Sequence, residues 1–150
     1  MTETIRFGAP ASAKAPRSLG QAVGRGARLK CPACGVGPLF YRYLKVNRDC
    51  PHCGEALHHQ RADDAPPYFT VFIVGHVIIG LMLSIEVAYA PPLWLHMALW
   101  IPLTFVMALA LLPVVKGALV GYQWALYMHG FDPEHQDEYA SIEPAGAARG

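Results

Sequence analysis

Two long runs of apolar residues dominate the second half of the chain. The first extends from Tyr68 to Tyr89 and the second from Leu93 to Val115. As α-helices they would be roughly 33 and 34 Å long, which is enough to cross the hydrocarbon core of a bilayer. The connection between them, Ala90–Pro92, is so short that it forces an antiparallel pair. The pattern therefore predicts a transmembrane hairpin. The alternative, two buried helices of a soluble protein, fits runs of this length poorly.

Basic residues are concentrated on one side of this predicted hairpin. Ten of the twelve Lys and Arg precede Tyr68, Lys116 follows the second run, and the Ala90–Pro92 turn has none. Four aromatic residues suit the two membrane boundaries as interfacial belts: Tyr68 and Phe69 on the basic side, Tyr89 and Trp94 at the turn. By the positive-inside rule we expect a multi-pass membrane protein whose N- and C-termini are both cytoplasmic.

The segments at the two ends of the chain are more polar. Over the whole chain apolar residues make up 53 % and charged residues 15 %, against a charged share of roughly 25 % in soluble proteins. Residues 1–27 are basic and lack the apolar run of a secretory signal, so we expect a flexible arm near an anionic membrane surface. A transit peptide and a nucleic-acid-binding arm are the alternatives. Residues 131–150 are acidic and are expected to form a flexible tail.

Small residues recur between the second apolar run and the tail. Gly117, Gly121 and Ala125 stand at every fourth position, which would give a helix one smooth face for close packing against another helix. Trp124 and Tyr127 suit the headgroup layer of a membrane. We expect residues 117–129 to form an interfacial helix, or else an extension of the second span, within a membrane domain of residues 61–130.

The four cysteines of the chain fall into two matching CPxCG motifs. Cys31 and Cys34 form the first and Cys50 and Cys53 the second, in a C-x₂-C-x₁₅-C-x₂-C pattern typical of a zinc site. Two intervening residues let one tight turn direct both thiolates at a single ion, and the following glycines suit a positive φ. Four thiolates close a tetrahedral shell. We therefore predict one structural zinc ion per chain in a zinc ribbon of residues 28–60, with a short β-hairpin whose aromatic strand covers residues 39–44.

Other chemistry for these thiols must be compared with zinc. Iron in the same cage is the main alternative, because tetrahedral thiolate sites accept both metals. Disulfides or redox pairs would require an oxidising compartment, whereas this end of the chain is predicted to be cytoplasmic. Three histidines lie nearby in the sequence, His52, His58 and His59, and are expected at the surface because four cysteines already fill the shell. So small a module depends on its metal for folding.

Ionisable residues inside a membrane are functional hypotheses by default. Three of them and one candidate thioether ligand lie within the apolar runs: His76, Glu86, His96 and Met107. Glu86 lies four residues before Ala90 and His96 four after Pro92, so the two should share one depth, where pairing would hold the hairpin in register. The alternative is a path for protons or for a soft metal such as copper. Asp63 and Asp64, just before the first run, suit a helix start or the docking of a partner.

Several motifs of this chain are specific when taken together. They are CPACG, CPHCG, HHQRADDAPPYFT, VGH, LALLPVVKGALVG and QWALYMHGF, between Arg28 and Phe131. In this combination the chain resembles a bacterial membrane family known as domain-of-unknown-function family 983. The resemblance implies a bacterial inner-membrane protein with a ribbon and two spans, and it brings no assigned reaction. It also implies an association with terminal oxidase components, and hence with the assembly of respiratory complexes.

The sequence shows no constellation of catalytic residues. It has no Ser/His/Asp set, no phosphate-binding loop and no metal site with an open position. We therefore expect a non-enzymatic accessory or assembly factor, whose ribbon binds a cytoplasmic partner and whose hairpin packs against a membrane complex. The alternative is a small metal or proton carrier that uses the four intramembrane residues named above. No nucleic-acid partner is expected, and no small-molecule substrate is identified.

Overall fold

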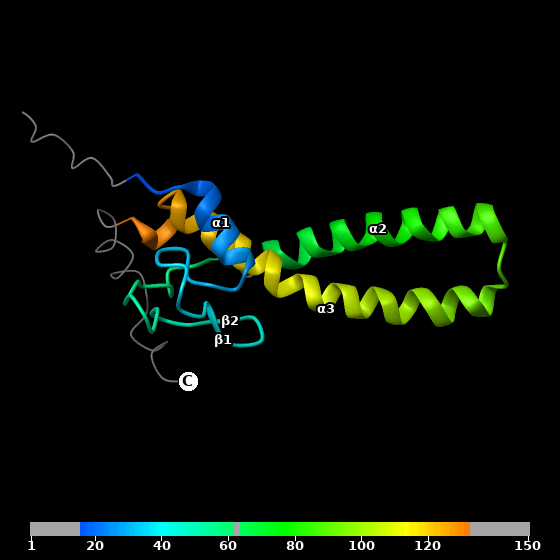
Figure 1. The fold of residues 1–150 in the computed structure, drawn as a ribbon, viewed down its shortest axis with the longest axis horizontal. Coiled ribbons are helices and arrows are strands. Elements are labelled where there is room, and N and C mark those ends of the chain that lie inside the picture. The colour runs from blue at the N-terminus through cyan, green and yellow to red at the C-terminus, as the bar shows by residue number, and fades with distance from the viewer. Residues whose placement is uncertain (1–15, 62–63, 133–150) are drawn as a thin grey trace, which may run out of the picture.

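A long helical hairpin carries a cysteine-rich module at its open end. The computed structural model describes residues 16–61 and 64–132, and Figure 1 shows the hairpin and the module arranged along the long axis. The elements follow in the order α1 (Leu19–Ala27), β1 (Phe40–Arg42), β2 (Lys45–Val46), α2 (Ala65–Tyr89), α3 (Leu93–Ala125) and the 3₁₀ helix η1 (His129–Phe131). We call residues 28–60 the cysteine module.

The hairpin forms where the apolar runs predict it. Helix α2 begins with Pro66 and Pro67 in its first turn, where the missing N–H of proline costs no helical hydrogen bond. It ends at Tyr89, and the next residue, Ala90, adopts a left-handed conformation with φ 43° and donates its N–H to the carbonyl of Glu86. Pro92 then caps the start of α3 in an extended conformation. Two prolines and one left-handed residue therefore complete the reversal.

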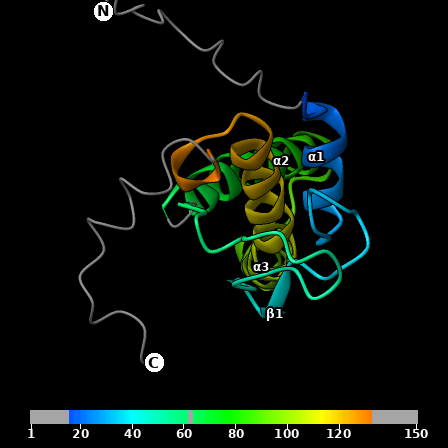
Figure 2. The ribbon, with the colours of Figure 1, turned by 90° about the vertical axis from the view of Figure 1, so that its left-hand side faces the viewer.

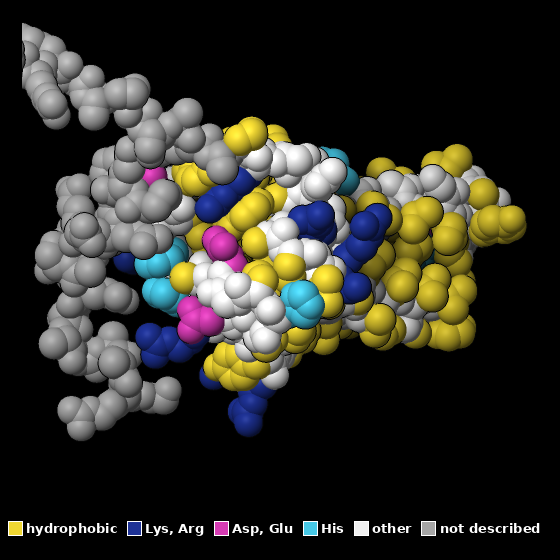
Figure 3. Space-filling model, turned by 60° about the vertical axis from the view of Figure 1, so that its left-hand side comes forward, with side chains coloured by type: hydrophobic (Ala, Val, Ile, Leu, Met, Phe, Trp, Pro, Cys, Tyr) yellow, Lys and Arg dark blue, Asp and Glu magenta, His cyan; other side chains and the backbone are white. Residues whose placement is uncertain are grey.

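Most of the apolar surface of the hairpin is exposed. In their most apolar stretches only 11 % of α2 and 6 % of α3 is buried, and Figure 3 shows hydrophobic side chains covering this end of the molecule. Buried helices of a soluble protein would show the opposite. Both helices are long and apolar enough to cross a membrane, by length and composition.

A narrow seam joins the two helices. Its buried residues are Val74 and Ile78 of α2 and Trp100 of α3, with Met82 and Met107 packed against them. Contacts along α2 recur at four-residue spacing, as expected for one face of a helix. Most other side chains in the apolar stretches of α2 and α3 are exposed.

Helix α3 is longer than the predicted second span. For residues 117–129 the sequence left two alternatives open, a separate interfacial helix or an extension of the second span. Residues 117–125 continue α3 without a break, so the extension is correct and the separate helix is wrong. Proline at position 113 does not end the helix. Its missing N–H leaves the carbonyl of Leu109 without a helical donor, and the Tyr43 hydroxyl donates to that carbonyl at 2.7 Å.

The predicted flexible arm is wrong for its last part, because residues 19–27 form helix α1. Gly26 lies so close to the backbone of Gly117 that no side chain fits at either position, and Ala22 lies in the same way against Gly121. Small residues at four-residue spacing on both helices allow this approach. Figure 2, viewed from the module end, shows α1 beside the end of α3. The contact explains the small residues of α3.

Residues 1–15 of the predicted arm and the predicted tail from residue 133 lie outside the described residues.

The cysteine module shares its core with α3. Its strands pair antiparallel, Phe40 opposite Val46, and residues 43 and 44 form the turn, so the strand is shorter than the predicted 39–44. Leu39 and Leu57 are fully buried and belong to one cluster with Val120 of α3. Residue 120 lies outside the predicted ribbon boundaries. The module therefore depends on α3 to complete its core.

Candidate metal centre and polar pair

The two CPxCG motifs form equivalent turns. Gly35 has φ +72° and donates its N–H to the Cys31 carbonyl at 2.8 Å, while Gly54 has φ +75° and donates to the Cys50 carbonyl at 2.9 Å. Glycine adopts this left-handed conformation without the strain of a side chain. Each turn brings both of its thiols to the same side, facing the other turn.

The four sulfur atoms form one cluster. The Sγ atoms of Cys31, Cys34, Cys50 and Cys53 all lie within 4.8 Å of one another. Two of the separations, Cys31 to Cys53 and Cys34 to Cys50, are 3.8 Å. A tetrahedron with Zn–S bonds of about 2.3 Å has edges of about 3.8 Å, so these two separations match those of a zinc site and the cluster is compatible with zinc. All four cysteines are free thiols rather than disulfides.

The cysteines differ in their surroundings. Cys31 is buried, and burial raises the pKa of its thiol. The backbone N–H of Gly37, assisted by that of Val36, bonds the sulfur of Cys34 and lowers the pKa of this thiol to about 6. A bound cation would favour the thiolate form of every one of them. Four thiolates leave no open position for a substrate, which is the donor set of a structural site.

Arginine side chains tie the first turn to neighbouring elements. Arg25 of α1 donates to the carbonyls of Pro32 and Ala33 at 3.1 and 2.7 Å. Arg17 donates to the Trp124 carbonyl at 2.7 Å, and its guanidinium lies 4.1 Å from the centre of the Trp124 ring. These contacts hold α1, the module and the end of α3 in one arrangement. Neither arginine was among the predicted site residues. The only sequence signal is indirect: the four-residue spacing of Ala22 and Gly26 favours close packing of the helix next to Arg17 that carries Arg25.

Glu55 and Gln123 form further hydrogen bonds between the end of α3 and the rest of the chain. The Trp124 indole N–H donates to Glu55 at 2.7 Å. Gln123 is buried and exchanges two hydrogen bonds with the backbone of Arg61, accepting from its N–H at 3.1 Å and donating to its carbonyl at 3.2 Å. The second pair fixes the chain just before α2 against the end of α3.

The group of side chains that could hold a metal consists of the four cysteines and includes none of the three nearby histidines. His58 stacks on His59 with ring centres 3.9 Å apart, and its Nδ1 lies 3.8 Å from a carboxylate oxygen of Asp49. His59 contacts η1, where it meets Phe131 edge-on and lies directly against Gly130. His52 is exposed, with its Cβ near Gly37. His52 and His58 are exposed, as expected, whereas His59 is partly buried against η1.

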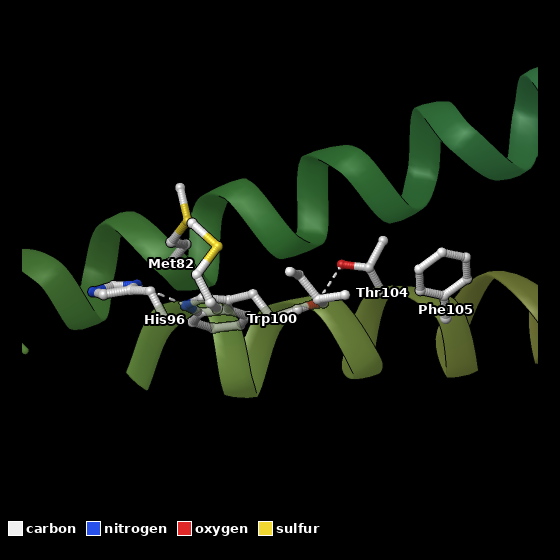
Figure 4. Close-up of a pocket in the computed structure, with 7 residues that line it drawn as sticks. Met82, His96, Trp100, Thr104 and Phe105 are labelled. Atoms are coloured by element: carbon white, nitrogen blue, oxygen red, sulfur yellow. Dashed lines mark hydrogen bonds between the residues drawn. The ribbon is translucent and has the colours of Figure 1, made fainter. Parts of the chain in front are cut away.

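Glu86 and His96 meet across the hairpin, as the matching depths predict. The Nε2 of His96 lies 3.0 Å from a carboxylate oxygen of Glu86, and the Trp100 indole N–H lies 2.9 Å from His96 Nδ1 (Figure 4). An indole can only donate, so Nδ1 accepts and the ring proton is on Nε2, which donates to Glu86. Both ring nitrogens of His96 are therefore occupied. Sequence analysis did not identify Trp100 as the third member.

The structure does not bring the other intramembrane candidates to this pair. His76 is exposed, and its Nδ1 bonds the Phe72 carbonyl of its own helix at 2.8 Å. Met107 packs in the seam between the helices. A pocket of about 280 Å³ is lined by His96 together with Met82, Met97, Trp100, Ile101, Thr104 and Phe105, and not by His76 or Met107 (Figure 4). Sequence analysis did not single out Met82 or Met97.

Of the two predicted docking acids, only Asp64 is described. It is the residue before α2, it is exposed, and its side chain makes no capping hydrogen bond. Asp63 lies outside the described residues.

The fold and the site define a protein with a cluster of four cysteines that could hold a metal ion and two apolar helices that could span a membrane. The chain belongs to the family described as "Protein of unknown function (DUF983)", whose family model matches residues 40–124. This confirms the resemblance seen in the sequence. The match includes the second cysteine pair and most of both long helices, while the first pair and α1 precede it. No curated protein and no solved structure matches the chain.

Proposed function

We propose that this protein is a non-enzymatic accessory or assembly factor of a membrane complex, in particular of a respiratory terminal oxidase. In this proposal α2 and α3 span the bacterial inner membrane, both chain ends are cytoplasmic, and the four cysteines hold one structural zinc ion. Iron would fit the same four thiolates. The metal's part is to fix the fold of the cysteine module.

The observation that carries this proposal is the shared core of the module and α3. Val120 of α3 is fully buried in the same cluster as Leu39 and Leu57 of the module. A cytoplasmic protein bound to the module would therefore be held at a fixed position relative to helices in the bilayer. Such an arrangement suits a factor that aligns a soluble protein, or a soluble segment, with membrane helices.

Two further features support binding rather than catalysis. The four thiolates close the metal shell, so the metal offers no position to a substrate. The exposed Asp64 lies at the start of α2, beside the module, where a basic patch of a cytoplasmic partner could reach it. Together with Asp63 it remains our candidate for partner docking.

Affinity purification in mild detergent tests this proposal. We expect the wild-type protein to retain zinc and a membrane-protein partner in fixed stoichiometry, and Asp64→Lys to lose the partner while keeping the zinc. Arg48→Glu, also an exposed charge reversal on this side of the chain, is the matched control and should keep both. Protein that carries metal but no partner under all conditions would contradict an assembly role and favour the carrier.

The carrier hypothesis, a small intramembrane metal or proton carrier, keeps its four residues His76, Glu86, His96 and Met107. Only Glu86 and His96 are in contact, and both ring nitrogens of His96 already have hydrogen-bonding partners. A metal would have to displace one of these bonds to reach the imidazole. We therefore place the carrier second.

A further inference from the structure

The turn between β1 and β2 extends from the cysteine module along α3. We call residues 41–45 the hairpin tip. In Figure 1 the tip points towards the paired helices α2 and α3. Its Tyr43 hydroxyl donates to the Leu109 carbonyl at 2.7 Å, so the tip is in direct contact with α3. The contact is at one defined register, because Pro113 frees this particular carbonyl.

The position of Leu109 gives the depth of the tip. Leu109 follows Leu93, the first residue of α3, by sixteen residues, which corresponds to about 24 Å along a helix. The hydrocarbon core of a bilayer is about 30 Å thick. If α3 enters at Leu93, the Tyr43 hydroxyl reaches a carbonyl about 6 Å within the inner edge of the hydrocarbon. The tip then lies in the cytoplasmic headgroup layer.

The composition of the tip suits that layer. Tyr41 and Tyr43 are 60 % and 56 % exposed, and tyrosine is a typical residue of membrane interfaces. Arg42 and Lys45 are exposed on the same turn, and no acidic residue occurs between Leu39 and Arg48. Long basic side chains at an interface extend their charges towards phosphate groups. Figure 3 shows further Lys and Arg side chains along the border where the apolar surface of the hairpin begins.

We propose that the hairpin tip is a lipid-binding element: Tyr41 and Tyr43 insert into the cytoplasmic headgroup layer, while Arg42 and Lys45 bind the phosphates of anionic phospholipids. The proposal rests on the membrane placement given above. It adds that the cysteine module lies on the membrane surface and does not project freely into the cytoplasm. Bound lipid would thereby fix which face of the module a partner meets.

Hydrogen–deuterium exchange in lipid nanodiscs tests this inference. The zinc-loaded full chain is placed in discs of phosphatidylcholine alone, or of phosphatidylcholine with phosphatidylglycerol. We expect slower exchange of the tip amides in the discs that contain phosphatidylglycerol. The variant with both Arg42→Glu and Lys45→Glu should lose this difference. Loss of two basic residues near an anionic surface lowers lipid binding by about 30-fold, and the two added carboxylates lower it further.

Controls separate the inference from the membrane placement. Arg48→Glu removes an exposed cation outside the tip and should leave the lipid effect intact. Protected amides throughout α2 and α3, with equal exchange of the tip in both lipids, would overturn the lipid-binding tip alone. Fast exchange of α2 and α3 would contradict the membrane placement itself. Zinc content, measured for each variant, shows that the module is folded.

Discussion

The helical hairpin and the cysteine module differ in what holds each of them together. In α2 and α3 the backbone hydrogen bonds close largely within each helix, apart from carbonyls such as that of Leu109, and the two helices share a narrow seam around Trp100. In the cysteine module the strands are two or three residues long, and its order depends on contacts between distant parts of the chain. Glu55 of the module, for example, accepts a hydrogen bond from Trp124 of α3, which lies 69 positions further along the sequence.

This difference predicts which region loses its structure when a residue is substituted. In the proposed membrane placement, lipid obliges each spanning helix to satisfy its own backbone, so we expect α2 and α3 to remain helical without the module. The module, in contrast, packs against α1 and the end of α3, and in our proposal it also needs a metal held by its four cysteines. Changes in any of these three should disorder the module and leave the hairpin helical.

The largest effect is expected from loss of a metal ligand. Structural zinc in small modules contributes about 10–16 kcal/mol of apparent binding free energy, so Cys50→Ser should abolish zinc binding and leave the module sensitive to protease. Elemental analysis and limited proteolysis measure these two results. Circular dichroism in detergent should still show the helices of the hairpin.

His52→Ala is the matched control for that experiment. His52 is the exposed variable residue of the second CPxCG motif and is not one of the four clustered ligand residues, so its loss should leave the zinc content unchanged. One zinc ion retained per chain after Cys50→Ser would contradict the four-thiolate site. Loss of helix in the hairpin would contradict the independence of the two regions.

The next effect tests the contact between α1 and α3. A methyl group at Gly26 would collide with the backbone of Gly117, so Gly26→Ala should cost about 1–3 kcal/mol and release α1. At Gly24, on the same helix, an added methyl meets nothing within 4 Å. Gly24→Ala should therefore stabilise α1 by up to about 1 kcal/mol. Thermal unfolding and exchange of residues 19–27 measure both, and equal effects would show that the close contact is unimportant.

A smaller effect is expected at the junction of the two regions. Tyr43→Phe removes the hydroxyl that bonds the Leu109 carbonyl, at a cost of about 1 kcal/mol. Exchange of the amides near the hairpin tip should rise, while the zinc content stays the same. Tyr41→Phe, on the same hairpin and equally exposed, is the control. If both variants behave alike, the bond to Leu109 does not anchor the tip.

The comparison also explains what the sequence could and could not predict. The spans and the tight turn follow from local hydropathy and from Pro91 and Pro92, and the structure has them within three residues of the predicted bounds at three of four ends. The metal cluster follows from CPxCG spacing alone, because each turn is a local structure. The pairing of Glu86 with His96 follows from counting residues away from the turn.

The remaining features depend on contacts that no local pattern encodes. Helix α1 contains Gly20, Gly24 and Gly26, so its helix propensity is low, and it is ordered by packing on α3. The continuation of α3 past Gly117 has the same cause, because α1 covers the small residues there. The binding of Tyr43 to Leu109 requires both a strand turn and a proline on another element. Contacts between distant parts of the chain determine all three of these structural features.

The smallest expected change in stability, and the one that bears most on function, concerns Glu86. His96 donates from Nε2 to Glu86, and an amide oxygen can accept the same bond, so Glu86→Gln should change stability by less than about 1 kcal/mol. If the pair only holds the hairpin in register, membrane abundance and respiratory activity should both stay normal. A carrier of protons or metal predicts normal abundance with lost activity, because glutamine neither titrates nor binds a soft cation well.

Trp100→Phe distinguishes the structural hypothesis from the carrier further, since it removes the hydrogen bond to His96 Nδ1 and keeps an aromatic ring in the seam. Under the structural hypothesis this variant is tolerated with a modest loss of stability. Gain of copper binding by Trp100→Phe, absent from the wild type, would show that the indole normally keeps this imidazole from acting as a ligand.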